Sequence, residues 1–384
     1  MLDMKPTSLT RATVSLSLLA GVVTAQVAGS PVDTPSRPKI LGIAHIALYV
    51  HDVEAARGFY KDLLGFGEPF HLDNKDGSLS LTFIKVNDRQ YIELFPEKKP
   101  QTDRLAHIAI EVDDAEAMRA YFAANGVKVP ATVAKGRIGN SNFMVTDPDG
   151  HLVEVVQYQP DAWTAREKGK FLGESRVSTR IRHIGISVGK LEPAMKFYGG
   201  LLGFKEIWRG SKEGKVLDWV NMRVPDGDDY LEFMLYDQPP SLERLGTMHH
   251  ICLEVPDLNK AVAVLNDRPA RKNYTKAMEM KTGTNRKRQL NLFDPDGTRS
   301  ELMEPTTVDG KPVPPSTAPA PIDHYNVRCF SAQRKRAGLA RRIPRRTQRW
   351  RAARRKGQGP RSSLVLLAPN RRPADSTRAR IRPA

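Results

Sequence analysis

The stretch HIALYVHDVEAARGFYKDLLGF, residues 45–66, returns as HIGISVGKLEPAMKFYGGLLGF at residues 183–204. In both copies a His opens an alternating apolar strand, a helical segment follows, and the copy closes on Leu-Leu-Gly-Phe. Weaker copies begin at His107 and His250. A unit that returns in a fixed order is the sequence signature of a repeat architecture. We therefore expect four His-led strand–helix units, arranged as two pairs.

The first pair spans residues 40–158. Period-two alternation predicts strands, and apolar residues at helical spacing predict helices. The expected strands cover 43–50, 78–86, 90–95, 107–112, 141–145 and 151–157, and the expected helices cover 53–64 and 115–125. The sequence DPDG at 147–150 predicts a tight turn, because Asp, Pro and Gly suit the backbone angles of turns.

The second pair spans residues 179–305 and repeats this order, with a second DPDG at 294–297. A polar connector over 159–178 separates the pairs. Each unit is expected to form a strand, a helix and two or three further strands, which makes the fold class α+β. Alternating strands favour open, curved, antiparallel-rich sheets with one polar face.

The two ends of the chain differ from the body. Residues 1–25 have the basic start, apolar run and small residues of a signal peptide, and the apolar run is too short to span a membrane. We expect a secreted or periplasmic protein; the alternative is a chance apolar run. Residues 26–39 and 306–321 are Pro-rich linkers, and residues 322–384 form an Arg-rich tail that we expect to be disordered.

The net charge of +17 comes from this tail. Residues 322–384 hold 19 Lys and Arg against two acids, so the rest of the chain is neutral. Nucleic-acid binding is therefore expected only through the tail, and an extension without function is the favoured alternative. The partner we expect is a small-molecule substrate, with no membrane association. The two cysteines suggest neither a disulfide framework nor a zinc motif.

Residue types that bind metals recur at matched places in the two pairs. The first set is His45, Glu93, His107 and Glu154, and the second set is His183, Glu232, His250 and Glu301. Each Glu stands in an otherwise apolar strand, where a carboxylate is costly to desolvate unless it is paired or bound to a cation. A lone His or Glu in a strand is usually structural. The eightfold coincidence of type and register favours metal sites.

Two imidazoles and two carboxylates suit Zn, Ni, Co, Mn or Fe(II) as the divalent metal ion. His249 is out of register with the repeats, and we expect it to support the site or the fold. His51, His71 and His151 also fall outside the pattern and are expected at the surface.

In these motifs the chain resembles the vicinal oxygen chelate superfamily, which includes glyoxalase I, bleomycin and fosfomycin resistance proteins and extradiol dioxygenases. The resemblance covers residues 40–304 and rests on the repeated unit and on the two DPDG-x3-E endings. It implies βαβββ modules that form two open-barrel domains around a divalent metal ion. The fold hosts many reactions, so it does not imply a substrate.

The His-Glu-His-Glu order is similar to that of glyoxalase I. Extradiol enzymes carry a His and a Tyr ahead of the last Glu, and here Met144 and Asn291 stand where the Tyr would fall. The resemblance thus favours a lyase or isomerase in which the metal is a Lewis acid and Glu154 or Glu301 moves a proton. A dioxygenase and a ligand-sequestering resistance protein remain the alternatives.

The positions that hold glutathione in glyoxalase I differ in this chain. Tyr49 and Ser187 replace its Arg, and Glu97 and Tyr236 replace its Asn. Glutathione is therefore not the expected co-substrate. The sequence leaves open whether each site forms within one pair or across both, and whether the protein is a monomer of two fused domains or a homodimer.

Overall fold

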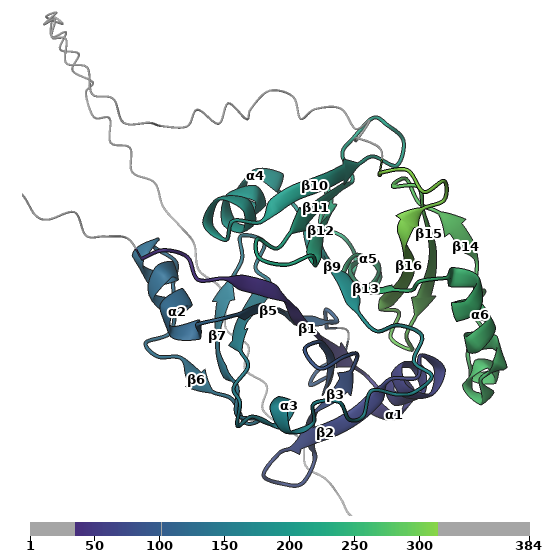
Figure 1. Cartoon of the computed structure of the whole chain (residues 1–384), viewed down its shortest axis with the longest axis horizontal. Helices are drawn as coiled ribbons and strands as arrows, with labels where there is room; N and C mark the ends of the chain where they lie inside the picture. Colours follow the sequence, from purple (N-terminus) through teal and green to yellow (C-terminus); the bar gives the residue numbers. More distant parts are fainter. Residues whose placement is uncertain (1–34, 101, 314–384) are drawn as a thin grey trace, which may run out of the picture. The chain divides into compact units, whose positions relative to one another are not determined.

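The computed structural model describes residues 35–100 and 102–313 (Figure 1). The expected signal peptide and Arg-rich tail lie outside these ranges, as do parts of both expected linkers. Within the described ranges, no helix is long and apolar enough to cross a membrane.

The chain folds into two eight-stranded sheets of matching topology. The first sheet, from the first half of the body (residues 40–158), has the order β2-β3-β4-β1-β5-β8-β7-β6. Its strands are β1 (Ile40–Val50), β2 (Gly67–Asp73), β3 (Leu79–Lys85), β4 (Tyr91–Pro96), β5 (Leu105–Val112), β6 (Ala134–Lys135), β7 (Ser141–Thr146) and β8 (Leu152–Gln157). Only the β1–β4 and β5–β8 pairings are parallel.

The second sheet, from the second half (residues 179–307), has the order β10-β11-β12-β9-β13-β16-β15-β14. Its strands are β9 (Ile181–Val188), β10 (Lys205–Gly210), β11 (Trp219–Arg223), β12 (Tyr230–Leu235), β13 (His250–Glu254), β14 (Met280–Thr282), β15 (Lys287–Phe293) and β16 (Arg299–Thr307). The predicted α+β class with two antiparallel-rich, open-barrel sheets is confirmed. Strand β16 continues two residues into the linker expected from 306.

Two longer helices pack against the sheets, and shorter helices connect the strands. The helices are α1 (Val53–Arg57) with η1 (Gly58–Leu63), α2 (Ala115–Ala124), α3 (Trp163–Arg166), α4 (Leu191–Ala194) with η2 (Met195–Leu201), α5 (Leu242–Met248), α6 (Leu258–Asp267) and η3 (Pro269–Asn273). Helix α2 packs against β7 and β8, and α6 packs against β15 and β16 (Figure 1). The helix predicted over 53–64 is present, but η1, its second part, is a π-helix. The short helices α3 and α5 were not predicted.

Alternation along the strands separates the apolar core from the polar face. Ile46, Ile92 and Ile108 belong to the main core cluster on the helix-covered side. The His or Glu next to each of them in sequence points to the opposite face, because successive strand side chains alternate. The same pattern repeats in the second half.

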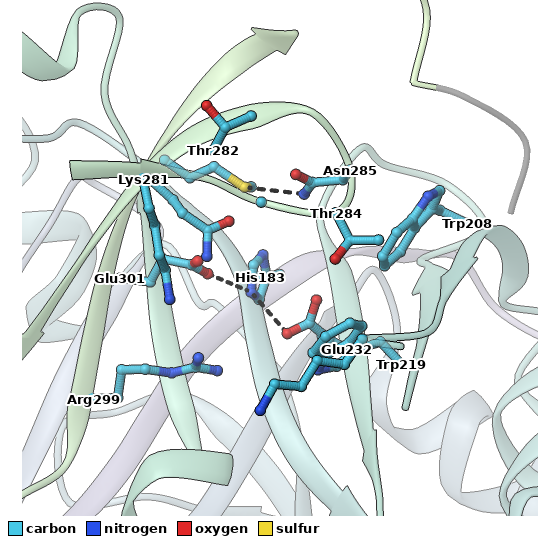
Figure 2. Close-up of a pocket in the computed structure, with 14 residues that line it drawn as sticks. His183, Trp208, Trp219, Glu232, Lys281, Thr282, Thr284, Asn285, Arg299 and Glu301 are labelled. Carbon is cyan, nitrogen blue, oxygen red and sulfur yellow. Dashed lines mark hydrogen bonds and ion pairs between the residues drawn. The ribbon is translucent and has the colours of Figure 1, made fainter. Parts of the chain in front are cut away.

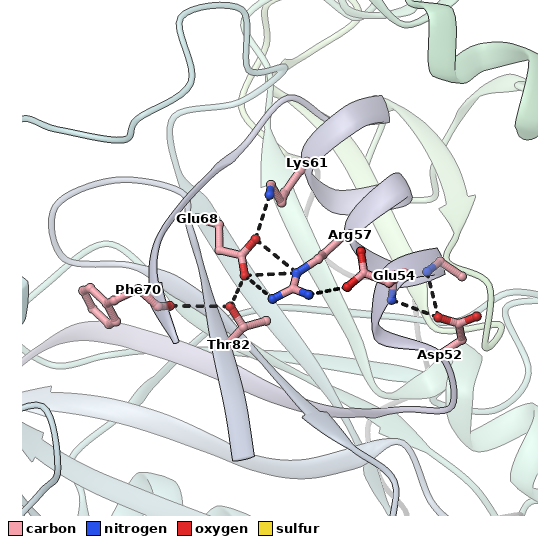
Figure 3. A network of polar contacts seen from close by, with 8 residues as sticks. Asp52, Glu54, Arg57, Lys61, Glu68, Phe70 and Thr82 are labelled. Carbon is pink, nitrogen blue, oxygen red and sulfur yellow. Dashed lines mark hydrogen bonds and ion pairs between the residues drawn. The ribbon is translucent and has the colours of Figure 1, made fainter. Parts of the chain in front are cut away.

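A charged network holds the first helix against the β2–β3 hairpin (Figure 3). The Glu68 carboxylate accepts hydrogen bonds from Arg57 Nη2 at 2.6 Å and Lys61 Nζ at 2.7 Å, and also from the Thr82 hydroxyl. Burial alone would raise the pKa of Glu68, but these donors outweigh burial and lower that pKa to about 2. The network fixes the hairpin that forms one wall of the first cavity described below.

Reciprocal contacts join the two halves. The Tyr60 hydroxyl donates to Asp294 Oδ2 at 3.0 Å, and the Tyr198 hydroxyl donates to Asp147 Oδ2 at 2.9 Å. Each Asp opens one of the two DPDG turns, and each Tyr belongs to a Phe-Tyr pair of the repeated unit. The Phe-Tyr pair of each half therefore contacts the DPDG turn of the other half.

A buried array at this interface corrects one prediction. His151 is not a surface residue, because its side chain is 9% exposed and bonds Asp147 Oδ2 at 2.9 Å. The Ser187 hydroxyl lies 2.8 Å from His249 Nε2 and 3.3 Å from His151 Nε2, and His249 Nδ1 lies 3.1 Å from Asp103. His249 thus has a structural role between the halves.

The other two histidines outside the pattern lie at the surface, as predicted. The side chains of His51 and His71 are 72% and 54% exposed. His51 pairs with Glu97.

Candidate metal centre

Four strands of the first sheet place the first ligand set on one face. His45 lies on β1, Glu93 on β4, His107 on β5 and Glu154 on β8. All four are buried. These strands are adjacent in the order β4-β1-β5-β8, so residues that are distant in sequence converge without any loop.

Small residues fill the positions between the members of the set. Ala47 on β1 is in register with Glu93 on β4 and with His107 on β5. Ala109 on β5 is in register with His45 on β1 and with Glu154 on β8. A methyl group at each position leaves space for the four longer side chains to meet above the sheet.

The distances within the first set are short. The Nε2 atoms of His45 and His107 lie 3.0 Å apart, and Glu154 Oε2 lies 3.2 Å and 3.1 Å from them. Glu93 is held less tightly, because its oxygens lie 3.6 Å from His45 Nε2 and 3.7 Å from His107 Nε2. Ligand atoms of His45, Glu93 and His107 all lie within 4.8 Å of one another, a spacing that could hold a metal ion.

The two carboxylates differ in their electrostatics. Burial raises the pKa of Glu93, and the histidines reduce that shift only partly. Burial also acts on Glu154, but hydrogen bonds from His107 and His45 outweigh it and lower its pKa. Burial lowers the pKa of His45, yet Glu93 and Glu154 outweigh burial and raise it. The set is a coupled group of opposite charges from which bulk water is largely excluded.

A cavity of about 210 Å³ opens onto the first set. Its walls are mainly apolar and include Leu72, Leu81, Phe83, Phe95 and Val156. Asn140, Asn142 and Arg137 supply its polar edge, where the Arg137 guanidinium bonds the Ser80 hydroxyl and the Asp73 carbonyl. The space suits a small molecule with an apolar body.

The second set converges in the same way but less tightly. His183 and His250 place their Nε2 atoms 3.1 Å apart. Glu301 lies 3.4 Å and 3.8 Å from these two atoms, and Glu232 lies 3.9 Å and 3.4 Å from them. Atoms of His183, His250 and Glu301 also meet the 4.8 Å spacing.

The ring of His250 is held differently from its counterpart in the first half. Gly185 stands in the place of Ala47, and a Cβ there would lie 2.0 Å from His250 Cε1 and Nδ1. The ring occupies this space, and its Nδ1 lies 2.8 Å from the Met248 carbonyl oxygen. Arg299 Nη2 lies 2.7 Å from Nδ1 and 2.8 Å from Nε2 of the same ring. Burial, followed by Arg299, lowers the pKa of His250.

The second cavity is larger and more cationic, with a volume of about 480 Å³. Trp208 and Trp219 line it together with Lys212, Lys281 and Arg299. In the view of Figure 2, the two indoles lie on one side of the cavity, and Lys281 and Arg299 lie on the other. The two sites thus share two histidines and two glutamates at equivalent positions and differ in the cavities beside them.

The structure brings all eight predicted site residues together, each set within its own half. The sequence left open whether each site forms within one pair or across both. In the described residues, each site forms within one half. Sequence reasoning missed Arg299, the two indoles and Cys252, whose thiol hydrogen-bonds the Glu301 carboxylate. Arg299 stands where the first half has Leu152, and Cys252 where it has Ala109, so residue-by-residue alignment of the repeats could have identified both.

Comparison with known proteins agrees with this architecture. The "Probable lactoylglutathione lyase" from Vibrio parahaemolyticus is 30% identical over 123 residues, which is 30% of this chain and 89% of that protein. The Mn(II)-bound glyoxalase from Novosphingobium aromaticivorans is 20% identical with a TM-score of 0.55, covering 76% of this chain and 92% of the other. The 2,3-dioxygenase LapB from Pseudomonas is 16% identical with a TM-score of 0.53, covering 73% and 99%.

These solved structures support the fold rather than a particular reaction, because their sequence identity to this chain is low. The family match is more specific and covers both halves, at residues 42–155 and 180–302. The chain belongs to the Glyoxalase/Bleomycin resistance protein/Dioxygenase superfamily.

Proposed function

We propose that the protein is a metal-dependent lyase or isomerase that acts on a small molecule with two adjacent oxygens, at the first site. The observation that carries the proposal is the convergence of two histidines and two carboxylates, His45, His107, Glu93 and Glu154, beside a cavity. This donor set suits Mn, Fe(II), Co, Ni or Zn. When bound, a divalent ion would supply Lewis-acid polarisation of the substrate oxygens.

The two carboxylates lie at different distances from the histidines, which favours a different role for each. Glu154 Oε2 lies within hydrogen-bond distance of both histidines and orients their rings. Glu93 lies 3.6 Å and 3.7 Å from them, so its carboxylate is freer to move a proton at the carbon next to the substrate carbonyl. We therefore favour Glu93 over the sequence-based candidate Glu154 as the general base of this site.

The surroundings favour a small substrate other than a glutathione adduct. Four residues of this chain stand at positions that bind glutathione in glyoxalase I. The side chains of two of them form hydrogen bonds or ion pairs within this protein. Ser187 bonds His249 at the interface of the halves, and Glu97 pairs with His51 and Arg104. The cavity of about 210 Å³ has mainly apolar walls, and Asn140 and Asn142 on it offer amide groups to substrate oxygens.

Proton exchange in D2O tests the proposal directly. The metal-loaded full chain is incubated with a panel of 2-oxoaldehydes and hydroxy-carbonyl epimers, and deuterium at the carbon next to the carbonyl is followed by NMR. We expect incorporation without O2 consumption, and its loss in Glu93→Gln at saturating metal. O2 uptake with catechols would instead indicate a dioxygenase, and ligand binding without exchange would indicate a sequestering protein.

Export remains part of the proposal. It rests on the signal-peptide pattern of residues 1–25 and fits a substrate that does not require intracellular glutathione. Recovery of the chain from a bacterial periplasm, shortened near residue 25 by mass spectrometry, would support it. An intact N-terminus in the cytoplasm would contradict it.

A further inference from the structure

We propose that the second site does not hold a metal ion as the first does, but binds a planar anion, an aromatic carboxylate, on Arg299. The inference stands on the second half alone and does not depend on the reaction proposed for the first site.

The guanidinium beside His250 argues against a metal ion at this ring. The His250 Nδ1–H donates to the Met248 carbonyl at 2.8 Å, which leaves Nε2 as the ring's lone-pair nitrogen. Arg299 Nη2 lies 2.8 Å from Nε2 and 2.7 Å from Nδ1, so the guanidinium stands against the ring between its two nitrogens. A metal ion bound at Nε2 would meet this fixed positive charge.

The same cavity carries three cations against two carboxylates. Arg299, Lys212 and Lys281 line it, and none of them forms an ion pair within residues 35–100 and 102–313. Arg299 Nε is buried and has no hydrogen-bond partner there. Glu232 and Glu301 offset two of the three charges, so the cavity remains cationic. A guanidinium presents a planar fork of donors that matches a carboxylate.

The indoles indicate the shape of the ligand. The Trp208 and Trp219 rings are inclined by 21° with centroids 6.4 Å apart, and both line the cavity. Flat apolar faces of this kind favour contact with another planar group. The volume of about 480 Å³, against 210 Å³ at the first site, leaves room for an aromatic ring beside the guanidinium.

The test measures 2-naphthoate binding to the full chain by calorimetry and by quenching of tryptophan fluorescence, with neutral 2-naphthamide as the matched ligand. We expect naphthoate to bind at least tenfold more tightly than naphthamide. Arg299→Leu, which copies Leu152 of the first half, should weaken naphthoate binding at least tenfold and raise the metal content from one to two ions per chain. Leu152→Arg is the reverse exchange and should remove the metal from the first site.

A second variant tests the proposal even if Arg299→Leu does not fold. Lys281→Gln changes an exposed side chain of the same cavity and should weaken naphthoate binding several-fold with no change in the melting temperature. Equal binding of naphthoate and naphthamide, or two metal ions per chain before any substitution, would overturn the proposal.

Discussion

The two halves of the chain place two histidines and two glutamates on equivalent strands, yet they build different sites. In the first half, Ala47 is in register with His107, and Glu154 Oε2 lies 3.2 Å and 3.1 Å from the Nε2 atoms of His45 and His107. In the second half, the His250 ring lies over Gly185 and contacts Arg299. One methyl group and one guanidinium therefore separate a candidate metal centre from a cationic cavity. The comparison teaches that residues beside a ligand set decide what the set can bind.

The largest expected effect contrasts the two carboxylates on equivalent strands, Glu93 and Glu232. Glu93→Gln should lower turnover by roughly 10²- to 10⁴-fold, the usual contribution of a general base, because an amide cannot accept the proton. Glu232→Gln should leave turnover within about twofold. The measurement is kcat at saturating metal in the proton-exchange assay. Equal losses in the two variants would remove the functional difference between the halves.

The two turn aspartates should respond to pH in opposite directions. Burial raises the pKa of Asp294 from 3.8 to about 6. A raised folded pKa means that this group's stabilisation is fully present below pH 3.8 and is lost as the pH rises through 6, by about 3 kcal/mol. Asp294→Asn should remove this dependence, since an amide still accepts from the Thr298 N–H and donates to Tyr60.

Asp147 is the matched control. Burial raises its pKa, but His151 outweighs burial and lowers it, so its stabilisation is present above pH 3.8 and is lost as the pH falls through the folded pKa. Asp147→Asn should therefore destabilise the protein at pH 7. Urea unfolding between pH 4 and 8 measures the free energy of unfolding of both variants. If the two substitutions changed this free energy in the same direction at pH 7, the expected difference would be contradicted.

A smaller effect is expected from exchanging the residues beneath the imidazoles. Gly185→Ala introduces a Cβ only 2.0 Å from the His250 ring and should lower the free energy of unfolding by about 1–3 kcal/mol. Ala47→Gly should cost about 0.5–1 kcal/mol, the usual effect of glycine in a strand. Chemical unfolding at pH 7 measures both. If Gly185→Ala proved the milder change, the His250 pose described here would be wrong.

The smallest effects should be equal in the two halves. Tyr60→Phe and Tyr198→Phe each remove one hydroxyl that donates to a turn aspartate, which should cost about 1 kcal/mol. The two hydroxyls bond different aspartates, so the double variant should show the sum within about 0.5 kcal/mol. If the two single variants lost different amounts of stability, the two reciprocal hydrogen bonds would not be energetically equivalent.

Much of the fold could be predicted because its signals are local and repeated. Alternation located β1, β3 and β4, and the recurrence of His and Glu at matched spacing identified both ligand sets. The β2 strand, the π-helical turn of η1 and helix α5 lacked such signals, since neighbouring elements determine them. The burial of His151 depends on the other half of the chain, which a single-segment pattern does not contain.

The difference between the sites was harder to foresee. Arg299 and His250 are 49 residues apart, and their contact depends on the register of β13 against β16. Gly185 in an alternating strand shows only a missing side chain, and its consequence appears when the ring of His250 fills the space. Ligand types could therefore be predicted from the sequence, whereas the orientation of a ligand could not.

Metal content of the full chain, measured by mass spectrometry after loading with Mn and removal of free ions, tests the central claim most directly. His45→Ala and His183→Ala are measured beside the parent. We expect one ion per parent chain, none in His45→Ala and one in His183→Ala. Two ions in the parent, or loss of the ion in His183→Ala with its retention in His45→Ala, would contradict the claim.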